Sequence, residues 1–506
     1  MLFSSIVFIF GFLPVALAGF HIAAKAGRTA AGIWLIGASL VFYGWMNPAS
    51  VVLLLISVCT NYSVARLILG TGDRPSIQAW IAGGGVAFNL GTLFYYKYLY
   101  WVVGSIAHFV PTVHTIDPIV LPLGISFFSF TQIGYLIDCK AGIARDRNFL
   151  NYMLFVTFFP HLIAGPILHN RDIMPQFGNP RTYRLSPKNL SIGLSIFFIG
   201  LLKKAVCADP LSEWVVDGYA HTGGTGLLPA WNLALCYSLQ LYFDFSGYSD
   251  MAIGLARMMN VRFPKNFDSP YKAQNVIEYW QRWHVTLTKF LTSYLYTPIA
   301  LGAMRWRIAR RLGVNRAAQQ TVAGFATMIA LPLLITITLA GVWHGSGLTF
   351  IVFGLLHGLY LCVNHATRVF YPGPRSTRMH AVILRCLATY LSVLVASVFF
   401  RAPSVGGALD VLGGMTGSHG LHGTAGSEPG LLHVVFLVSL YAIVWLFPNT
   451  QQIMRRYHPV LEDVDPPYLF GLTWRLNRRS SLAIGLAAAA GILMLGGTTE
   501  FLYFQF

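Results

Sequence analysis

The chain consists of long stretches without Asp, Glu, Lys or Arg, separated by short basic segments. A helix needs about 20 consecutive apolar residues to cross the hydrocarbon core of a bilayer. The pattern therefore predicts an all-α, multi-pass membrane protein with about 11 or 12 transmembrane helices, together with re-entrant and amphipathic helices. The uncharged stretches are residues 1–24, 29–65 (divided at Asn47-Pro48), 75–96, 98–116, 118–137, 148–170, 218–243, 317–367, 386–400, 429–454 and 480–499.

Two of these stretches need a separate interpretation. Residues 1–24 contain Ala16-Leu17-Ala18, which looks like a signal-peptide cleavage site, but no basic residue precedes the apolar run and Lys25 follows it. We expect a retained first span with its N-terminus outside. Residues 148–170 begin and end beside basic segments, so we expect them to enter the membrane and return, with Gly165-Pro166 interrupting the helix and surrounding protein covering it.

Positive charge is spread over the loops. There are 35 Lys and Arg against 18 Asp and Glu, a net charge of +17. Cytoplasmic loops of membrane proteins carry an excess of Lys and Arg, so this surplus indicates topology and not nucleic-acid binding. On this basis residues 406–430 lie outside, whereas the basic segments lie inside: Lys25/Arg28, Arg66/Arg74, Lys140/Arg145/Arg147, and those within residues 305–316, 368–385 and 455–479.

Composition excludes several classes of protein. Hydrophobic residues make up 55% of the 506 residues and charged residues 10%, against roughly a quarter charged in soluble domains. The six cysteines form no CxxC pair and lie in or beside apolar stretches, which is typical of buried free thiols. No internal repeat is visible, so we predict a single membrane domain over residues 1–506, with its core motifs in residues 120–370.

Polar groups inside a bilayer are costly, and those that persist there are candidates for function. Trp343-His344-Gly345 lies near the middle of the uncharged stretch 317–367. Two spans of about 20 to 25 residues fill that stretch, so the chain turns between Gly341 and Gly347. A neutral imidazole there can accept a proton. The alternative is a core histidine whose ring is satisfied by a carbonyl group.

A second candidate histidine lies in the segment WQRWHVTLTKFL. If this segment forms one helix, it has an apolar stripe and a separate polar face made by Gln281, His284, Thr288 and Thr292. Such a helix lines a polar cavity or lies at the membrane interface. His284 is therefore either part of a site or a residue that only bonds a neighbour.

Other motifs carry less information. FDFSGYSDMAIGLARMM places Asp244, Tyr248 and Asp250 at the end of an apolar span, where we expect them to cap a helix starting near Tyr248 and to shape a pocket. His357 and His365 have no acidic partners at metal-ligand spacing, so no metal site is expected. No GxSxG elbow, P-loop or GxGxxG after a strand is present, so nucleophilic-serine and nucleotide-phosphate chemistry lack support.

Three segments together resemble the membrane-bound O-acyltransferase (MBOAT) family, and most closely its bacterial branch that contains the alginate O-acetylation protein. They are FDFSGYSDMAIGLARMM, FPKNFDSPYKAQNVIEYWQRWHVTLTKFL and GVWHGSGLTFIVFGLLHG, and the ending FLYFQF agrees. The resemblance runs through essentially the whole chain. The two hallmark histidines of the family match His344, the catalytic position, and His284.

The resemblance implies a multi-span helical enzyme with a tunnel through the bacterial inner membrane. It implies transfer of an acetyl group from a cytoplasmic thioester, acetyl-CoA, through periplasmic acetyl-transfer partner proteins to an exopolysaccharide such as alginate or cellulose. No bound cofactor is expected. His344 would be the general base or a proton acceptor, and His284 would orient an acceptor or stabilise charge. The expected tunnel residues are Trp283, Trp343, Gln281, Thr288, Asp244 and Tyr248, with Trp283 and Trp343 excluding water.

Alternatives remain within and outside this family. Within it, D-alanyl transfer from a carrier protein or peptidoglycan O-acetylation would use the same fold. From another class, a proton-coupled transporter could use the same histidines as a relay, and a non-catalytic scaffold would need neither. The arginines in residues 305–316 could attract the phosphates of coenzyme A, but a topology signal alone also explains them.

Overall fold

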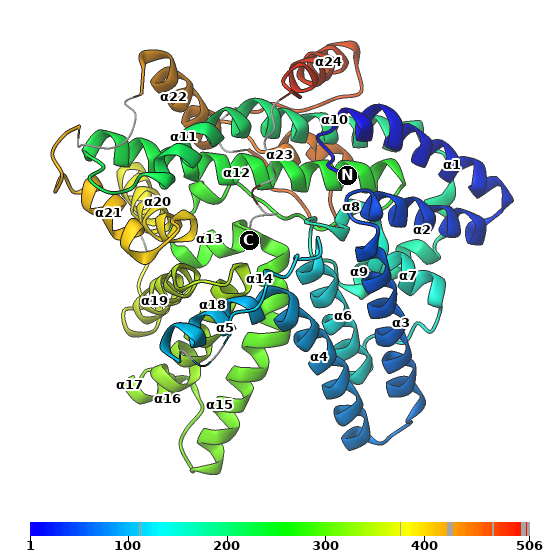
Figure 1. The fold of residues 1–506 in the computed structure, drawn as a ribbon, viewed down its shortest axis with the longest axis horizontal. Helices are drawn as coiled ribbons and strands as arrows, with labels where there is room; N and C mark the ends of the chain where they lie inside the picture. The colour runs from blue at the N-terminus through cyan, green and yellow to red at the C-terminus, as the bar shows by residue number, and fades with distance from the viewer. Residues whose placement is uncertain are drawn as a thin grey trace.

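The structure is a computed structural model that describes residues 1–110, 112, 114–374, 376–422, 429–467, 470–496 and 502. Within these ranges the secondary structure is helical throughout, without a strand (Figure 1). Seven helical segments are long and apolar enough to cross a membrane, or eight if the bent pair Leu431–Leu446 and Thr450–Tyr457 is one span. The all-α, multi-pass fold is therefore confirmed. Arg375, residues 423–428 and the ending FLYFQF apart from Leu502 lie outside the described residues.

The α-helices are α1 (Leu13–Ala26), α2 (Arg28–Gly44), α3 (Ala49–Gly70), α4 (Pro75–Lys97), α5 (Leu99–Phe109), α6 (Ile125–Lys140), α7 (Phe149–Thr157), α8 (Phe159–Leu162), α9 (Asn170–Gly178), α10 (Pro187–Leu202), α11 (Asp209–Ala220), α12 (Leu227–Met258), α13 (Val276–Arg282), α14 (Val285–Leu291), α15 (Thr297–Ala309), α16 (Arg316–Gln319), α17 (Val322–Phe325), α18 (Leu331–His344), α19 (Leu348–Phe370), α20 (Met379–Arg401), α21 (Val405–Met415), α22 (Leu431–Leu446), α23 (Thr450–Met454) and α24 (Arg478–Leu493). π- and 3-10-helical segments are η1 (Val7–Phe12), η2 (Pro180–Tyr183), η3 (Lys203–Ala208), η4 (Pro270–Lys272), η5 (Thr292–Tyr296), η6 (Ala326–Ala330) and η7 (Arg455–Tyr457).

The number of long apolar helices is smaller than the number of uncharged stretches. The described part of residues 98–116 contains the 11-residue α5, and residues 118–137 contribute to the 16-residue α6. Residues 218–243 lie largely inside α12, a 32-residue helix that is mostly buried in the protein. Absence of charge identifies backbone that can leave water, but it does not separate helices that face lipid from helices buried in the protein.

The predicted re-entrant segment is covered by protein. Helix α7 ends at Thr157, α8 occupies Phe159–Leu162, and the chain is irregular from Ile163 to His169. Every residue from 151 to 170 is buried. This confirms that the backbone breaks around Gly165-Pro166, where neighbouring helices must cover it because lipid cannot satisfy its polar groups.

Helices α10 and α12 pack backbone against backbone and lie side by side across the molecule (Figure 1). A Cβ atom at Gly193 would lie 2.5 Å from the carbonyl oxygen of Gly254, and one at Gly200 would lie 2.6 Å from that of Gly247. The same clashes would occur for a Cβ added at Gly254 or Gly247. These paired glycines allow the close approach that membrane helices use where lipid removes the hydrophobic driving force.

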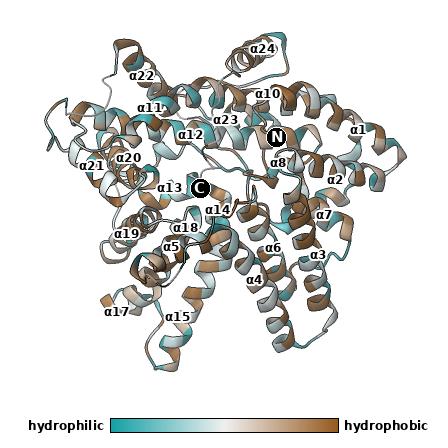
Figure 2. Cartoon of the chain, in the orientation of Figure 1, coloured by the Kyte–Doolittle hydropathy of each residue, from teal (hydrophilic) through white to brown (hydrophobic). Residues whose placement is uncertain are grey.

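Large apolar side chains also lie on the outer surface. Trp80 is 83% exposed and Leu432 is 86% exposed, and Figure 2 shows hydrophobic residues along the peripheral helices. In water such a surface would favour association, whereas in a bilayer it faces lipid. All six cysteines are free thiols, and Cys139, Cys236 and Cys386 are buried.

Candidate active site

His344 is the last residue of α18, and the chain turns there before α19 begins at Leu348. The predicted turn between Gly341 and Gly347 is therefore confirmed. A Cβ at Gly341 would lie 2.4 Å from the carbonyl oxygen of Phe350, and one at Gly345 would lie 2.1 Å from the Phe350 ring. The glycines let α18 and α19 approach closely, and this places His344 at the tip of the hairpin.

The C-terminal end of α18 is held by the end of α4. Lys97 Nζ donates to the carbonyl oxygens of Trp343, at 2.5 Å, and His344, at 3.1 Å. The hydroxyl of Tyr98 donates to the carbonyl oxygen of Val342 at 3.0 Å. The last carbonyls of a helix have no partner within the helix and carry partial negative charge. Lys97 therefore satisfies them and fixes the backbone from which His344 projects.

His344 lines two cavities. The first, of about 70 Å³, is lined by Lys97, residues 121–127, Ile163, Trp343 and His344. The second, of about 40 Å³, is lined by residues of α12, α13, α14, α19 and α20, and among them are His284, His344 and His357. His344 is the residue common to the two lining sets, so this residue borders both spaces.

The wall of the second cavity is mostly apolar and carries no charged side chain. Its hydrogen-bonding groups come from Ser238, Tyr271, Tyr279, Ser397 and the three histidines, and the rest of the wall is aromatic or aliphatic. The Phe400 ring meets the His344 ring edge-on at 5.1 Å between centroids. A small space of this kind suits neutral reacting groups and excludes bulk water.

His284 lies at a break between two helices. Helix α13 ends at Arg282 and α14 begins at Val285, and His284 between them has left-handed backbone with φ 43° and ψ 52°. The predicted single amphipathic helix is therefore wrong at this point. A non-glycine residue is rarely held in this region unless its surroundings determine it, and Val285 N donates here to the carbonyl oxygen of Asn266.

The side chain of Asn266 determines the tautomer of His284. Asn266 Oδ1 lies 3.0 Å from His284 Nδ1 and also accepts from the hydroxyl of Thr286 at 2.9 Å, while Asn266 Nδ2 donates to Ser249 at 2.9 Å. An amide oxygen only accepts, so His284 Nδ1 carries the proton. Burial lowers the pKa of His284 to about 3. The ring is thus neutral at pH 7, and its Nε2 is an acceptor.

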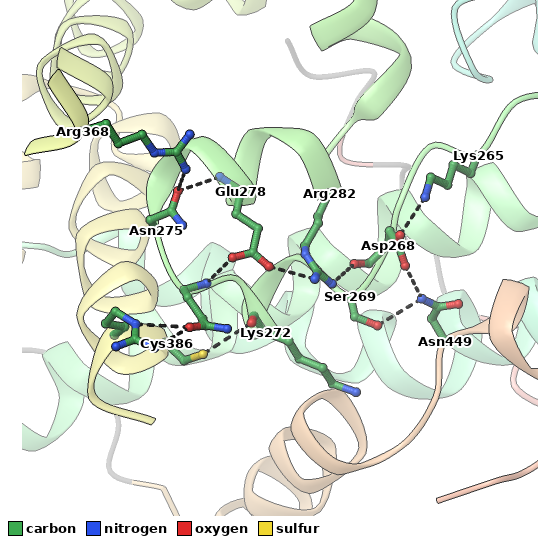
Figure 3. Close-up of polar contacts among 12 residues, drawn as sticks. Lys265, Asp268, Ser269, Lys272, Asn275, Glu278, Arg282, Arg368, Cys386 and Asn449 are labelled. Carbon is green, nitrogen blue, oxygen red and sulfur yellow. Dashed lines mark hydrogen bonds and ion pairs between the residues drawn. The ribbon is translucent and has the colours of Figure 1, made fainter. Parts of the chain in front are cut away.

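A polar network holds the loop and helix that precede His284 (Figure 3). Asp268 N donates to the carbonyl oxygen of Arg282, and Arg282 forms a 2.8 Å ion pair with Glu278. Lys265 pairs with the Asp268 carboxylate at 2.8 Å, and Asn449 donates to the other oxygen of that carboxylate at 3.0 Å. The network joins α13 to the segment that contains Asn266, so the histidine and its partner are positioned together.

The other predicted tunnel residues lie in different places. Trp283 lines the second cavity and Trp343 the first. Gln281 and Thr288 line a separate space of about 240 Å³ that also includes Trp280. These two residues lie on either side of the break and still line one space, whereas His284, at the break itself, lines the second cavity instead.

The carboxylate motif is buried in the protein core. Asp244 and Tyr248 lie in the middle of α12, so the predicted helix start near Tyr248 is wrong: the apolar run and the motif form one continuous helix. Asp244 pairs with Lys204 at 2.6 Å, and Tyr248 stacks on Phe3 with centroids 4.7 Å apart. Neither residue is among those lining the two histidine cavities.

Three residues of the site are missing from the sequence-based prediction. Lys97 ends an apolar stretch and Asn266 lies in a loop, and neither has a local pattern that indicates a contact with a distant histidine. The sequence pattern presents His357 only as a possible metal ligand, without acidic partners. It lines the second cavity, and its Nδ1 accepts from Trp280 Nε1 at 3.3 Å. The sequence does contain one signal for this position, because His357 lies within the family-like segment GVWHGSGLTFIVFGLLHG.

Residues 84–314 match the model of the MBOAT, membrane-bound O-acyltransferase family. The chain is 38% identical over 458 residues to the peptidoglycan O-acetyltransferase of Helicobacter pylori, covering 83% of this chain and 81% of that protein. It is 34% identical over 521 residues to the "Probable alginate O-acetylase AlgI" of Pseudomonas putida, covering the whole of both chains. It is also 26% identical over 266 residues to the teichoic acid D-alanyltransferase of Streptococcus thermophilus, covering 51% of this chain and 60% of that protein.

Proposed function

Because this chain belongs to the membrane-bound O-acyltransferase family and is a multi-pass membrane O-acyltransferase, we propose that it moves an acetyl group across the bacterial inner membrane for O-acetylation of an exopolysaccharide. The proposed donor is acetyl-CoA on the cytoplasmic side. The observation that carries the proposal is the position of His344 on the border of two cavities. A single imidazole in that position can meet a donor in one space and an acceptor in the other.

The charge pattern supports this direction of transfer. If the basic loops are cytoplasmic, the segment Val322–His344 runs from the inside, after the arginines of residues 305–316, to the outside. Helix α4 runs the same way from Arg74 to Lys97, and Lys97 contacts the end of α18. The first cavity then belongs to the outer half of the membrane, where periplasmic acetyl-transfer partner proteins would receive the group.

In the proposed reaction the oxygen of an acceptor hydroxyl attacks the carbonyl carbon of the acetyl thioester. His344 accepts the hydroxyl proton as the C–O bond forms, and that proton passes to the sulfur as the C–S bond breaks. General-base catalysis of this kind contributes about 10² to 10⁴ in rate. His284, with Nε2 as an acceptor, orients a hydroxyl or thiol. The proton of the neutral His284 ring is on Nδ1, where it is bonded to Asn266. Nε2 therefore has no proton to donate to an oxyanion.

The test is His344→Ala in cells, with polymer acetyl content and polymer yield measured separately. We expect acetyl content to fall by about 10² or more, since the base is lost, and polymer yield to stay unchanged. His380→Ala, a change of an exposed histidine at the start of α20, is the matched control and should change neither. Loss of export with residual polymer still acetylated would instead favour a transporter. Unchanged acetylation in both His344→Ala and His284→Ala would favour a scaffold.

A second candidate acceptor is peptidoglycan, because the similarity to the Helicobacter pylori peptidoglycan O-acetyltransferase covers most of both chains. The chemistry at His344 is the same, and only the acceptor differs. Measurement of O-acetyl groups on purified cell-wall fragments from cells with and without His344 distinguishes the two. A fall in cell-wall acetylation with exopolysaccharide unaffected would favour peptidoglycan.

A further inference from the structure

A basic cleft lies away from the two histidine cavities, and we propose that it binds a ligand that carries two or more phosphate groups. The cleft has a volume of about 580 Å³. Its walls come from the end of α9, from η2, from the starts of α10 and η7 and from the end of α12. Six basic side chains line it: Arg181, Arg184, Lys188, Arg257, Arg262 and Arg456.

The positive charge of the cleft is not neutralised by the described part of the protein. Asp172 is the one acidic residue in the described lining, and it lies 4.0 Å from Arg171, outside the lining set. None of the six basic side chains forms an ion pair with a carboxylate in the described ranges. Like charges gathered in one hollow repel one another, and a bound anion relieves that repulsion.

Arg257 gives an independent indication that an anion is required. Its Nη2 donates to the carbonyl oxygen of Tyr457 at 3.3 Å. Its Nε is buried and has no hydrogen-bond partner among the described residues. A buried donor on a charged group is costly to leave unsatisfied. Guanidinium groups bind phosphate oxygens through pairs of N–H donors, so a phosphate at the end of α12 would satisfy this atom.

The walls of the cleft are held by specific contacts. Gln176 Nε2 donates to the carbonyl oxygen of Arg262 at 2.9 Å, and Arg262 N donates to Gln176 Oε1 at 2.9 Å. Asn260, with φ 59°, donates to the carbonyl oxygens of Thr182 and Arg184, and it accepts from Asn189 at 2.7 Å. These bonds join η2, α10 and α12, so the basic groups converge on a preformed hollow.

The position of the cleft favours a phosphate ligand that arrives from the cytoplasmic side of the membrane. Arg28, at the start of α2 in a basic segment that the charge pattern places inside, donates to the carbonyl oxygen of Gly178 at the end of α9. Arg262 lies four residues before Asn266, so at most about 14 Å of extended chain separates the two residues. Asn266 in turn contacts His284. Coenzyme A and anionic lipids with two phosphate groups both carry the required chemistry on this side. Assignment to the acyl donor rests on the proposed function, whereas phosphate binding does not.

The test is binding of coenzyme A to the purified full-length protein in nanodiscs of neutral lipid, compared with dephospho-coenzyme A and with nanodiscs that contain cardiolipin. The variant is Arg184→Gln with Arg262→Gln, two exposed residues on different walls. The control is Arg478→Gln with Arg479→Gln, which removes the same charge from an exposed helix start elsewhere. If the first pair lowers thermal stability, Arg184→Gln with Arg456→Gln replaces it.

We expect the wild-type protein to prefer coenzyme A over dephospho-coenzyme A, and the variant to lose about tenfold or more in affinity, because two charge-assisted contacts are removed. The control should stay within about twofold of the wild type. If only cardiolipin retention falls in the variant, the phosphate ligand is a lipid headgroup. If the variant binds both probes as the wild type does, or if the wild type binds neither, the cleft is not a phosphate site. His344→Ala should abolish acetyl transfer and leave coenzyme A binding unchanged. Failure of the proposed acetyl transfer can therefore be distinguished from failure of phosphate binding in the cleft.

Discussion

His284 shows how one neighbouring side chain can set the chemistry of a buried residue. Asn266 accepts from Nδ1 and therefore leaves Nε2 as the acceptor of the neutral ring. The left-handed backbone at His284 separates α13 from α14. Asn266, a loop residue 18 positions earlier in the chain, thus fixes which ring nitrogen of His284 carries the proton. Its carbonyl oxygen also accepts from Val285 N and so holds the backbone beside His284.

Asn266→Leu should reduce acetyl transfer by about tenfold or more, because Nδ1 loses its acceptor and the wrong tautomer becomes accessible. Asn266→Asp keeps an acceptor, but its carboxylate favours the imidazolium and raises the His284 pKa from about 3. Transfer by this variant should fall as the pH is lowered through the raised pKa, at a higher pH than in the wild type. The measurement is the pH profile of transfer in membranes.

Two results would contradict this role for Asn266. One is wild-type transfer by Asn266→Leu at every pH. The other is an equal loss of acetyl transfer in both variants at every pH, together with an equal loss of thermal stability. If Asn266 were purely structural, the pH profile of transfer would not differ between the leucine and aspartate variants.

At the scale of helices, close packing at glycine decides where the chain can place its site. The α10 and α12 pair and the α18 and α19 hairpin both bring backbone within reach of backbone. Sequence periodicity predicts the presence of these helices. It does not indicate that Gly254 lies against Gly193, because that contact depends on which helices become neighbours.

Gly254→Ala should destabilise the protein by about 1–3 kcal/mol, since its Cβ would lie 2.5 Å from the Gly193 carbonyl oxygen and 2.7 Å from Phe197 N. Gly83→Ala in α4 is the control, because a Cβ there meets nothing within 4 Å and alanine favours helix over glycine. Thermal unfolding in detergent measures both. A Gly254→Ala protein as stable as the control would mean that the two helices can move apart without cost.

At the scale of the whole molecule, buried ion pairs connect distant parts of the chain. Lys204 pairs with Asp244 and with Asp209, each at 2.6 Å, and Leu502 N donates to the other oxygen of Asp244 at 3.2 Å. These contacts join η3, α11, α12 and the C-terminal segment. A buried charge is tolerated only when it is paired and hydrogen-bonded, so the network requires these segments to meet.

Lys204→Met should destabilise the protein by about 3–5 kcal/mol, because it leaves Asp244 buried without a cation. Adding Asp244→Asn should recover part of this loss, since the uncompensated charge is removed. Thermal stability of the single and double variants in detergent gives the comparison. A double variant less stable than Lys204→Met would show that the charge itself is not the source of the loss.

The sequence alone predicted the all-α membrane fold, the turn at His344 and the helix break near Gly165-Pro166, because hydrophobic length, glycine and proline act locally. It also identified the family through its motifs. Only the tertiary structure decided that the helix breaks at His284 and that Asp244 is an ion-pair partner of Lys204. It also decided that Lys97, Asn266 and His357 lie beside the two candidate histidines. These outcomes depend on contacts between segments far apart in the chain, and the polarity of a residue does not indicate which distant partner will satisfy it.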